Sequence, residues 1–355
     1  MPMARRGAGI VLPVMLLLGM LLSTHAAGGA DGPDAAKAAL SRSLTALGEA
    51  KGSPDLLVLT NAAYARLDGK TAERFLDDVT EVTGASLGSR SLLSIHSSML
   101  APFWFSLYSK NKQKIVFCAL KDGAFASQEI DAAPDALLAP DNWKTIRDGL
   151  IGSRLFSVAS ISLAWTGNPD FMALQAASFH DHFCPGVNYG LIMGDYIEKN
   201  FPLGPDDRYV FAVAPSNCAA DALQVMYNTT TGKGGDYGMG ISKEQQAAYA
   251  LNGITPSAVV LRVNTKKDVC DALALGIDSA RLYADMKLDE ADLAPPGGQQ
   301  NPLFHITRVR ASRELCRMPK EKRIGYVVEL KKMSGKASLA GEITANDPYA
   351  PIWGR

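Results

Sequence analysis

The chain carries a weak internal repeat, and a repeat restricts the choice of fold more than any other feature of this sequence. The segment "FLDDVTEVTGASLGSRSL" (75–92) superposes on "AADALQVMYNTTTGKGGD" (219–236) at an offset of 144 residues, with Asp77 on Asp221. Each copy reads as helix, strand, helix, glycine-rich turn and further strands. The sequence therefore predicts two tandem domains that mix helices and strands.

The repeat extends on both sides of this match. Continued without a gap, the same offset places "KIVFCAL" (114–120) on "AVVLRVN" (258–264), two β-rich runs of similar length. Upstream, an offset of 153 places "DLLVLTN" (55–61) on "RYVFAVA" (208–214). An insertion in the first copy accounts for the change of offset.

The two copies differ in their chemistry. The counterpart of "CPG" (184–186) in the first copy is "DGP" (31–33), and the counterpart of Cys218 is Arg74. Only the second copy has sulfur atoms at these positions. We therefore expect the first copy to be structural.

The first residues have the layout of a secretory signal. Arg5 and Arg6 precede an apolar run from Ile10 to Leu22, and small residues follow it, so we predict a signal peptide over residues 1–27 and a periplasmic or secreted protein. No later apolar stretch is long enough to span a membrane. Lys plus Arg equals Asp plus Glu at 36 each, which argues against a nucleic-acid partner.

Composition and the positions of proline- and glycine-rich stretches divide the rest of the chain into four parts. We expect the segment "TKKDVCDALALGIDSARLYADM" to be a helix, and the proline-rich end "NDPYAPIWGR" to be an extended tail. The predicted parts are the first copy over 28–125, a connector with a helical segment over 126–164, the second copy over 165–290 and a C-terminal extension over 291–355.

The segment "FHDHFCPG" (179–186) concentrates groups that bind metals. His180, His182 and Cys184 are spaced i, i+2, i+4, which in an extended segment sends all three side chains to one face. Imidazole and thiolate together suit Zn²⁺ or a similar borderline-soft ion. Pro185 and Gly186 then lead into a helix, so Cys184 lies just ahead of a helix N-terminus, where the thiolate is favoured.

Cys218 also lies at a predicted helix start. In "PSNCAADALQ" it follows Ser216 and Asn217, which are candidate N-cap residues, and it belongs to the first turn of the helix. If the two helix starts meet, two nitrogen and two sulfur atoms surround one site. A disulfide between Cys184 and Cys218 is the alternative, because exported proteins form such bridges.

The other histidines and cysteines suggest structural roles. His96 and His305 lie alone in apolar surroundings, and Cys118 alternates with apolar residues of a strand pattern. Cys270 and Cys316 either pair with each other or stay free.

Three motifs in the second copy resemble one known family. "HDHFCPG", "CAADALQ" and "NTTTGKG" are similar, in the same order, to motifs of the FmdE-like family, named after a component of formylmethanofuran dehydrogenase, over about 165–264. The resemblance implies an α+β fold with helices packed on a mixed or antiparallel sheet, metal binding and a tendency to dimerise. With the repeat, it implies two tandem FmdE-like domains that form an internal pseudo-dimer.

The resemblance also assigns residues. It makes His180, His182, Cys184 and Cys218 the metal ligands, and it makes Asp221, Gln224 and Lys233 polar positions near them. Together with Asp181, these three are the predicted cofactor-binding residues. In two places the chain departs from the family pattern: Asp181 replaces a glycine, and Thr229 stands where a further cysteine is usual, which removes one sulfur from the neighbourhood.

These observations predict a periplasmic protein that binds a metal ion or a metal-containing small molecule through the second copy. Zinc is the first candidate, with nickel and iron as others, and a homodimer is a candidate assembly. Two alternatives stay open. One is an enzyme in which the metal activates water or the thiolate acts as nucleophile, with no catalytic residue assigned. The other is a disulfide-stabilised accessory component of an envelope complex.

Overall fold

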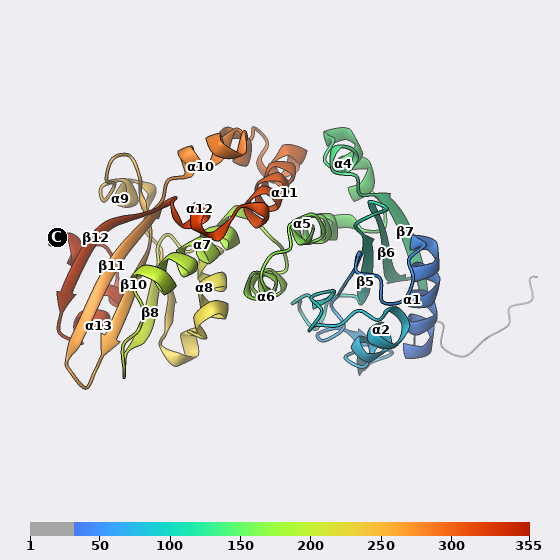
Figure 1. Ribbon diagram of the computed structural model, residues 1–355, viewed down its shortest axis with the longest axis horizontal. Helices are drawn as coiled ribbons and strands as arrows, with labels where there is room; N and C mark the ends of the chain where they lie inside the picture. The colour runs from blue at the N-terminus through green and yellow to red at the C-terminus, as the bar shows by residue number, and fades with distance from the viewer. Residues whose placement is uncertain (1–31) are drawn as a thin grey trace, which may run out of the picture.

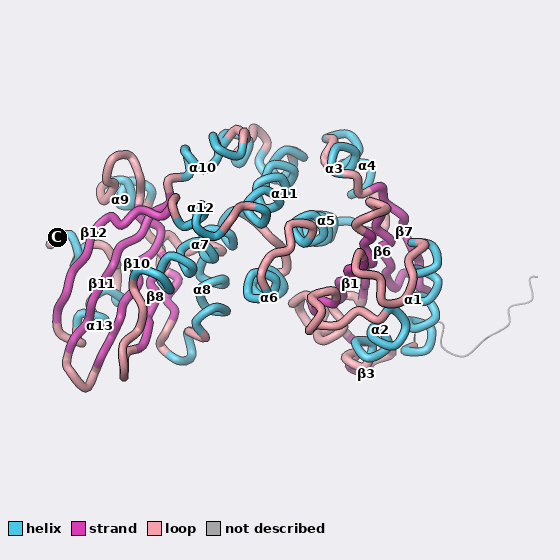
Figure 2. The backbone as a smooth tube through the Cα atoms, in the orientation of Figure 1, coloured by secondary structure: helices cyan, strands magenta, loops and turns pink. Residues whose placement is uncertain are grey.

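A computed structural model describes residues 32–355 as an α+β protein with two five-stranded mixed sheets and one two-stranded sheet. The two large sheets lie at opposite ends of the molecule, with helices between them (Figure 1 and Figure 2). The predicted signal peptide over 1–27 lies outside the described residues. Within 32–355, no helix combines the length and the apolar character that crossing a membrane requires.

The first sheet has the strand order β4-β1-β5-β6-β7. β1 pairs in parallel with β4, and every other neighbouring pair is antiparallel. Helices cover both faces of this sheet, and every residue of β1 is buried as a result. The strands are β1 (Leu56–Thr60), β4 (Leu92–Ser94), β5 (Trp104–Ser109), β6 (Lys114–Lys121) and β7 (Ala124–Asp131), and β2 (Arg66–Leu67) pairs with β3 (Lys70–Thr71) in a separate hairpin.

The second sheet, read from β9, has the order β9-β8-β10-β11-β12. β8 pairs in parallel with β9, and the remaining pairs are antiparallel. Strand for strand, the order and the directions are those of the first sheet. The strands are β8 (Arg208–Val213), β9 (Asp236–Gly238), β10 (Pro256–Asn264), β11 (Val269–Ile277) and β12 (Val327–Gly335).

Two helices occupy matching places in each half. α1 precedes β1 as α7 precedes β8, and α2 lies before β4 as α8 lies before β9. The offset of 144 places α2 on α8 and β4 on β9, residue for residue. The helices are α1 (Pro33–Leu47), α2 (Phe75–Thr83), α7 (Pro185–Asn200) and α8 (Ala219–Tyr227).

The continuation of that offset to the next strands was wrong. Thr60 of β1 pairs with Phe105, and Val213 of β8 pairs with Ala258, so β5 is the counterpart of β10. The ungapped alignment had matched β6 to β10. The loop before β10 is longer because it holds α9 (Lys243–Ala247), and a loop insertion leaves no trace in the hydrophobic pattern of the strands.

Two predicted elements have a different structure. The segment expected to be one helix is β11 followed by α10 (Ser279–Met286). β11 is covered on both faces and is apolar at nearly every position, so it lacks the alternation that identifies a half-exposed strand. The expected extended tail, 346–355, contains α14 (Ala350–Trp353), which packs on the second sheet together with the preceding α13 (Leu339–Ala345).

The chain parts also divide differently from the prediction. β7 belongs to the first sheet and crosses the predicted boundary at 125. The predicted C-terminal extension, 291–355, supplies β12 to the second sheet and α11 (Pro302–Arg317) to the central layer, so it is an integral part of the second half.

A layer of helices joins the two halves through one hydrophobic core. That core combines one face of the first sheet with residues of α5, α6, α7 and α11. α1 and α2 cover the other face of the first sheet, away from the second half (Figure 1), whereas α7 and α8 face the centre. The two halves therefore stack in the same sense. The remaining helices are α3 (Pro134–Leu137), α4 (Pro140–Arg147), α5 (Leu155–Trp165), α6 (Phe171–His180) and α12 (Lys320–Ile324).

A stripe of glycines lets α7 and α8 pack closely. Gly186, Gly190 and Gly194 recur every four residues along α7 and lie on one face of the helix. A Cβ atom at Gly190 would lie 2.5 Å from the carbonyl oxygen of Ala219 and 2.7 Å from the Cβ of Ala222. The absence of side chains on this stripe thus sets the distance between the two helices.

We predict that Gly190→Ala lowers the free energy of unfolding by about 1–3 kcal/mol, because the added methyl group overpacks the α7–α8 contact. Chemical denaturation monitored by circular dichroism measures the change. Gly341→Ala in α13 is the matched control, since a Cβ atom there meets nothing within 4 Å. Equal midpoints for the two variants would contradict a tight α7–α8 contact.

Candidate metal centre

His180, Cys184 and Cys218 form a compact group. One ligand atom from each, an imidazole nitrogen and two sulfur atoms, lies within 4.8 Å of the others. His180 is the last residue of α6, Cys184 is the N-cap of α7 and Cys218 is the N-cap of α8. The predicted meeting of two helix starts therefore occurs.

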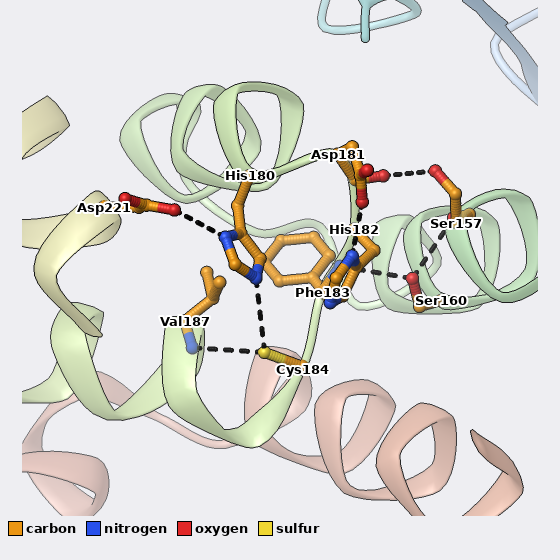
Figure 3. A network of polar contacts seen from close by, with 9 residues as sticks. All are labelled: Ser157, Ser160, His180, Asp181, His182, Phe183, Cys184, Val187 and Asp221. Carbon is orange, nitrogen blue, oxygen red and sulfur yellow. Dashed lines mark hydrogen bonds and ion pairs between the residues drawn. The ribbon is translucent and has the colours of Figure 1, made fainter. Parts of the chain in front are cut away.

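The start of α7 holds Cys184 in place. Pro185 occupies the first helical position, and the backbone N–H of Val187 donates to the Cys184 sulfur at 3.5 Å (Figure 3). Gly186 allows Cys218 to approach, because a Cβ atom at Gly186 would lie 2.8 Å from the Cβ of Cys218. The N–H groups and the dipole at such a helix start favour a negatively charged sulfur.

Asp221 orients His180. Its carboxylate accepts a hydrogen bond from Nδ1 of His180 at 2.6 Å, and Nε2 of the same ring then faces the Cys184 sulfur at 3.9 Å (Figure 3). A carboxylate behind a histidine ring fixes the orientation of a metal ligand and increases its basicity. Asp221 lies one turn into α8, so the same helix start positions both Cys218 and the partner of His180.

The three groups shift one another's pKa values. Burial lowers the pKa of His180, but its hydrogen bond to Asp221 and its proximity to Cys218 outweigh that effect and raise the pKa to about 10. The contact with Cys184, followed by that with His180, lowers the pKa of Cys218 to about 4 despite burial. The contact with Cys218 and burial raise the pKa of Cys184 well above its ordinary value. These shifts favour a thiolate at Cys218 beside a protonated His180, and a metal ion would displace the remaining protons.

A family comparison agrees with this geometry. Residues 179–273 match the family model described as "FmdE, Molybdenum formylmethanofuran dehydrogenase operon". This segment is FmdE-like. No curated protein matches the chain. The match begins one residue before His180 and includes Cys184, Cys218 and Asp221, so all four members of the site belong to the FmdE-like segment.

The start of the FmdE-like segment is not the extended run that the sequence predicted. α6 continues to His180, and Asp181 then adopts a left-handed conformation with φ 72°. Asp is among the residues that tolerate this region, which glycine occupies without strain. This explains how Asp181 can stand where the family pattern has a glycine. Ser157 and Ser160 of α5 hydrogen-bond to the backbone of Asp181 and Phe183 and hold the turn (Figure 3).

His182 lies beside the three-residue group and is not a member of it. Because the chain turns at Asp181, the His182 ring packs 4.6 Å from the ring of Phe156 and 4.5 Å from that of His180, measured between centroids. Its Nδ1 contacts the Asp181 carboxylate. A role of His182 as a fourth ligand stays a prediction.

Gln224 and Lys233, the other two predicted cofactor-binding residues, lie farther along α8 and beyond its end. The side chain of Lys233 donates to the backbone and side-chain oxygens of Asn228, the residue that ends α8. Lys233 and Thr229 are therefore at the opposite end of this helix from Cys218, roughly 15 Å along its axis. The threonine at position 229 accordingly removes no sulfur from the group of three. Gln224 is half-buried on α8, and its side chain has no hydrogen bond within residues 32–355.

His96 and His305 lie closer to the site than the sequence predicted. The ring of His305 lies 5.0 Å from Phe156, which in turn contacts His182. His96 lines a cavity of about 150 Å³ together with Asp181 and His182. All four histidines within 32–355 thus gather near the turn between α6 and α7, and no local motif around positions 96 or 305 signals this.

All five cysteines are free thiols in the structure. Cys118 is buried in the core between the first sheet and α1, as predicted. Cys270 and Cys316 belong to different hydrophobic cores, so they do not pair.

Asp221→Asn should destabilise the metal-free protein more at pH 6 than at pH 9.5. The pKa of His180 is raised from 6.5 to about 10 in the folded state, so its contribution is fully present below about pH 6.5 and disappears as the pH rises through 10. Urea unfolding at the two pH values measures the difference. Asp206→Asn, which removes an exposed carboxylate paired with Lys266, is the control. If Asp221→Asn lowers the free energy of unfolding equally at both pH values, Asp221 is not coupled to His180.

Proposed function

We propose that the FmdE-like segment binds a transition-metal ion through His180, Cys184 and Cys218. This proposal rests on one observation: three donor atoms, from the ends of three different helices, lie within 4.8 Å of one another. One imidazole and two thiolates are ligands that Zn²⁺ prefers, and nickel and iron accept the same set. The support of His180 by Asp221 is typical of metal-bound histidines.

The donor set also fits an open metal centre. Three protein ligands leave a further coordination position, which His182 or a small molecule could fill. A cavity of about 420 Å³ borders both Cys184 and Cys218, so a ligand can reach the sulfur atoms from this side. When bound, the metal would act as a Lewis acid or a redox centre according to its identity. The chain's own residues hold it, orient the histidine and shield one side from water.

We further propose that the chain is a tandem duplication in which only the second copy binds metal. The identical order and directions of the two large sheets support this, as do the matching positions of α2 and α8. In the first copy Arg74 is the N-cap of α2, where α8 begins with Cys218. Gly32 is the N-cap of α1, where α7 begins with Cys184, so matching the helix starts moves the counterpart of Cys184 from Asp31 to Gly32. Neither residue of the first copy can ligate a soft metal ion.

Export to the periplasm or the medium is part of the proposal. It rests on the arginine pair, apolar run and small residues of the segment 1–27. Cleavage after about residue 26, detected by N-terminal sequencing of protein from the envelope fraction, is the expected result. Intact protein in the cytoplasm would contradict it.

Wild-type protein purified without chelators should contain about one equivalent of bound metal. Cys184→Ala and Cys218→Ala should weaken Zn²⁺ binding at least about a hundredfold, because each removes a ligand. Elemental analysis and competition with a chromophoric chelator measure content and affinity. Cys118→Ala is the matched control, since Cys118 is a buried thiol of the first half. Less than about a tenth of an equivalent in the wild type would refute the proposal.

Thiol counting tests the disulfide alternative. Denatured, unreduced protein should react with five equivalents of a thiol reagent, the full number of cysteines. A count that is two lower and returns to five after reduction would indicate a bridge between Cys184 and Cys218, and would make the protein a disulfide-stabilised accessory component.

A further inference from the structure

The cavity beside the two cysteines has a wall that the metal proposal does not use. It has a volume of about 420 Å³, which lies within the range of small-molecule sites. Its lining includes Cys184, Cys218 and the first turn of α7. Arg308 of α11 and Glu290 also line it, and both lie outside the FmdE-like segment. The cavity thus brings two sulfur atoms and a positive charge together.

Arg308 is held in a fixed position. Its Nη1 donates to the backbone oxygens of Leu293 at 2.8 Å and Phe304 at 2.6 Å, and its guanidinium lies 3.5 Å from the centroid of the Phe304 ring. Both hydrogen bonds leave from Nη1, so within residues 32–355 the Nε and Nη2 groups have no protein partner. These two groups form the fork with which arginine binds a carboxylate through two parallel hydrogen bonds.

Arg308 also lacks a counter-ion among the described residues. Glu290 lines the same cavity, but no carboxylate within 32–355 lies within 4.0 Å of the Arg308 guanidinium. A half-buried guanidinium without an anionic partner favours a ligand that brings its own negative charge. Glu290 and the two sulfur atoms oppose a dianion such as phosphate. A carboxylate with a single negative charge fits this balance better.

We propose that this cavity binds a small organic carboxylate, with its carboxylate on the Nε and Nη2 groups of Arg308 and its other end at the Cys184–Cys218 wall. The inference rests on the proposed metal centre, because the free coordination position would receive the second end of the ligand. Arg308 acts as a specificity-determining residue, and the ligand is a short molecule with a carboxylate at one end and a metal-binding atom at the other.

The test compares two probes on cobalt-loaded protein, in which visible absorption bands report ligands that bind to the metal. The probes are 3-mercaptopropionate and its neutral amide, which have the same length and the same thiol. Wild-type protein should bind the acid at least about tenfold more tightly than the amide, the effect of one charge-assisted pair of hydrogen bonds. Arg308→Met should remove this preference and leave the affinity for the amide unchanged.

Arg310→Met is the matched control, because Arg310 lies on the same helix, is exposed and does not line the cavity; its Nη2 donates to the backbone oxygen of Leu138 at 3.4 Å. It should keep the full preference. Cobalt content is measured first on every variant: wild-type protein that holds no cobalt refutes the metal centre and this inference with it. Protein that holds cobalt but binds acid and amide equally, or an Arg308→Met variant that retains the preference, refutes the carboxylate site alone. The comparison of probes on wild-type protein decides the matter even if the variant fails to fold.

Discussion

The close contact between α7 and α8 is the constraint on which the site depends. Glycines at positions 186 and 190 allow the first turn of α8 to lie against the first turns of α7. Two cysteines at the two helix starts then come within reach of one ion, and Asp221 reaches back from α8 to the ring of His180. A side chain on this stripe would move the helices apart and separate all of these groups at once. Close-packed interiors transmit such changes over several residues.

Part of this arrangement could be predicted from the sequence. A cysteine before Pro185 and another after two capping residues each indicate a helix start, and the histidine nearby suggests a shared ion. The distance between the two helices could not be predicted, because it depends on the glycine stripe and on tertiary packing. The left-handed conformation of Asp181 was missed, although the family pattern has a glycine at this position and aspartate tolerates such a backbone. His182 consequently faces Phe156, whereas an extended segment would have turned it toward the sulfur atoms.

The spacing of the repeat predicted some of the matching helices and strands of the two halves, but it did not predict all of their correspondences. α2, α8, β4 and β9 follow the offset of 144, whereas β5 and β10 do not, because α9 lengthens one loop. β11 was read as a helix because both of its faces are buried and alanine and leucine dominate it. The motif around Lys233 was expected at the site, but it ends the helix that Cys218 begins. A motif's order in the chain does not reveal which end of an element it occupies.

The core between the two sheets has a consequence for how this protein can be handled. One continuous set of buried side chains runs from the first sheet through α5 and α6 to Cys184 and α7. The first half therefore packs against the second and shields one side of its candidate metal-binding residues from water. A fragment limited to the FmdE-like segment would expose a large hydrophobic surface and would lose most of the helix that ends in His180.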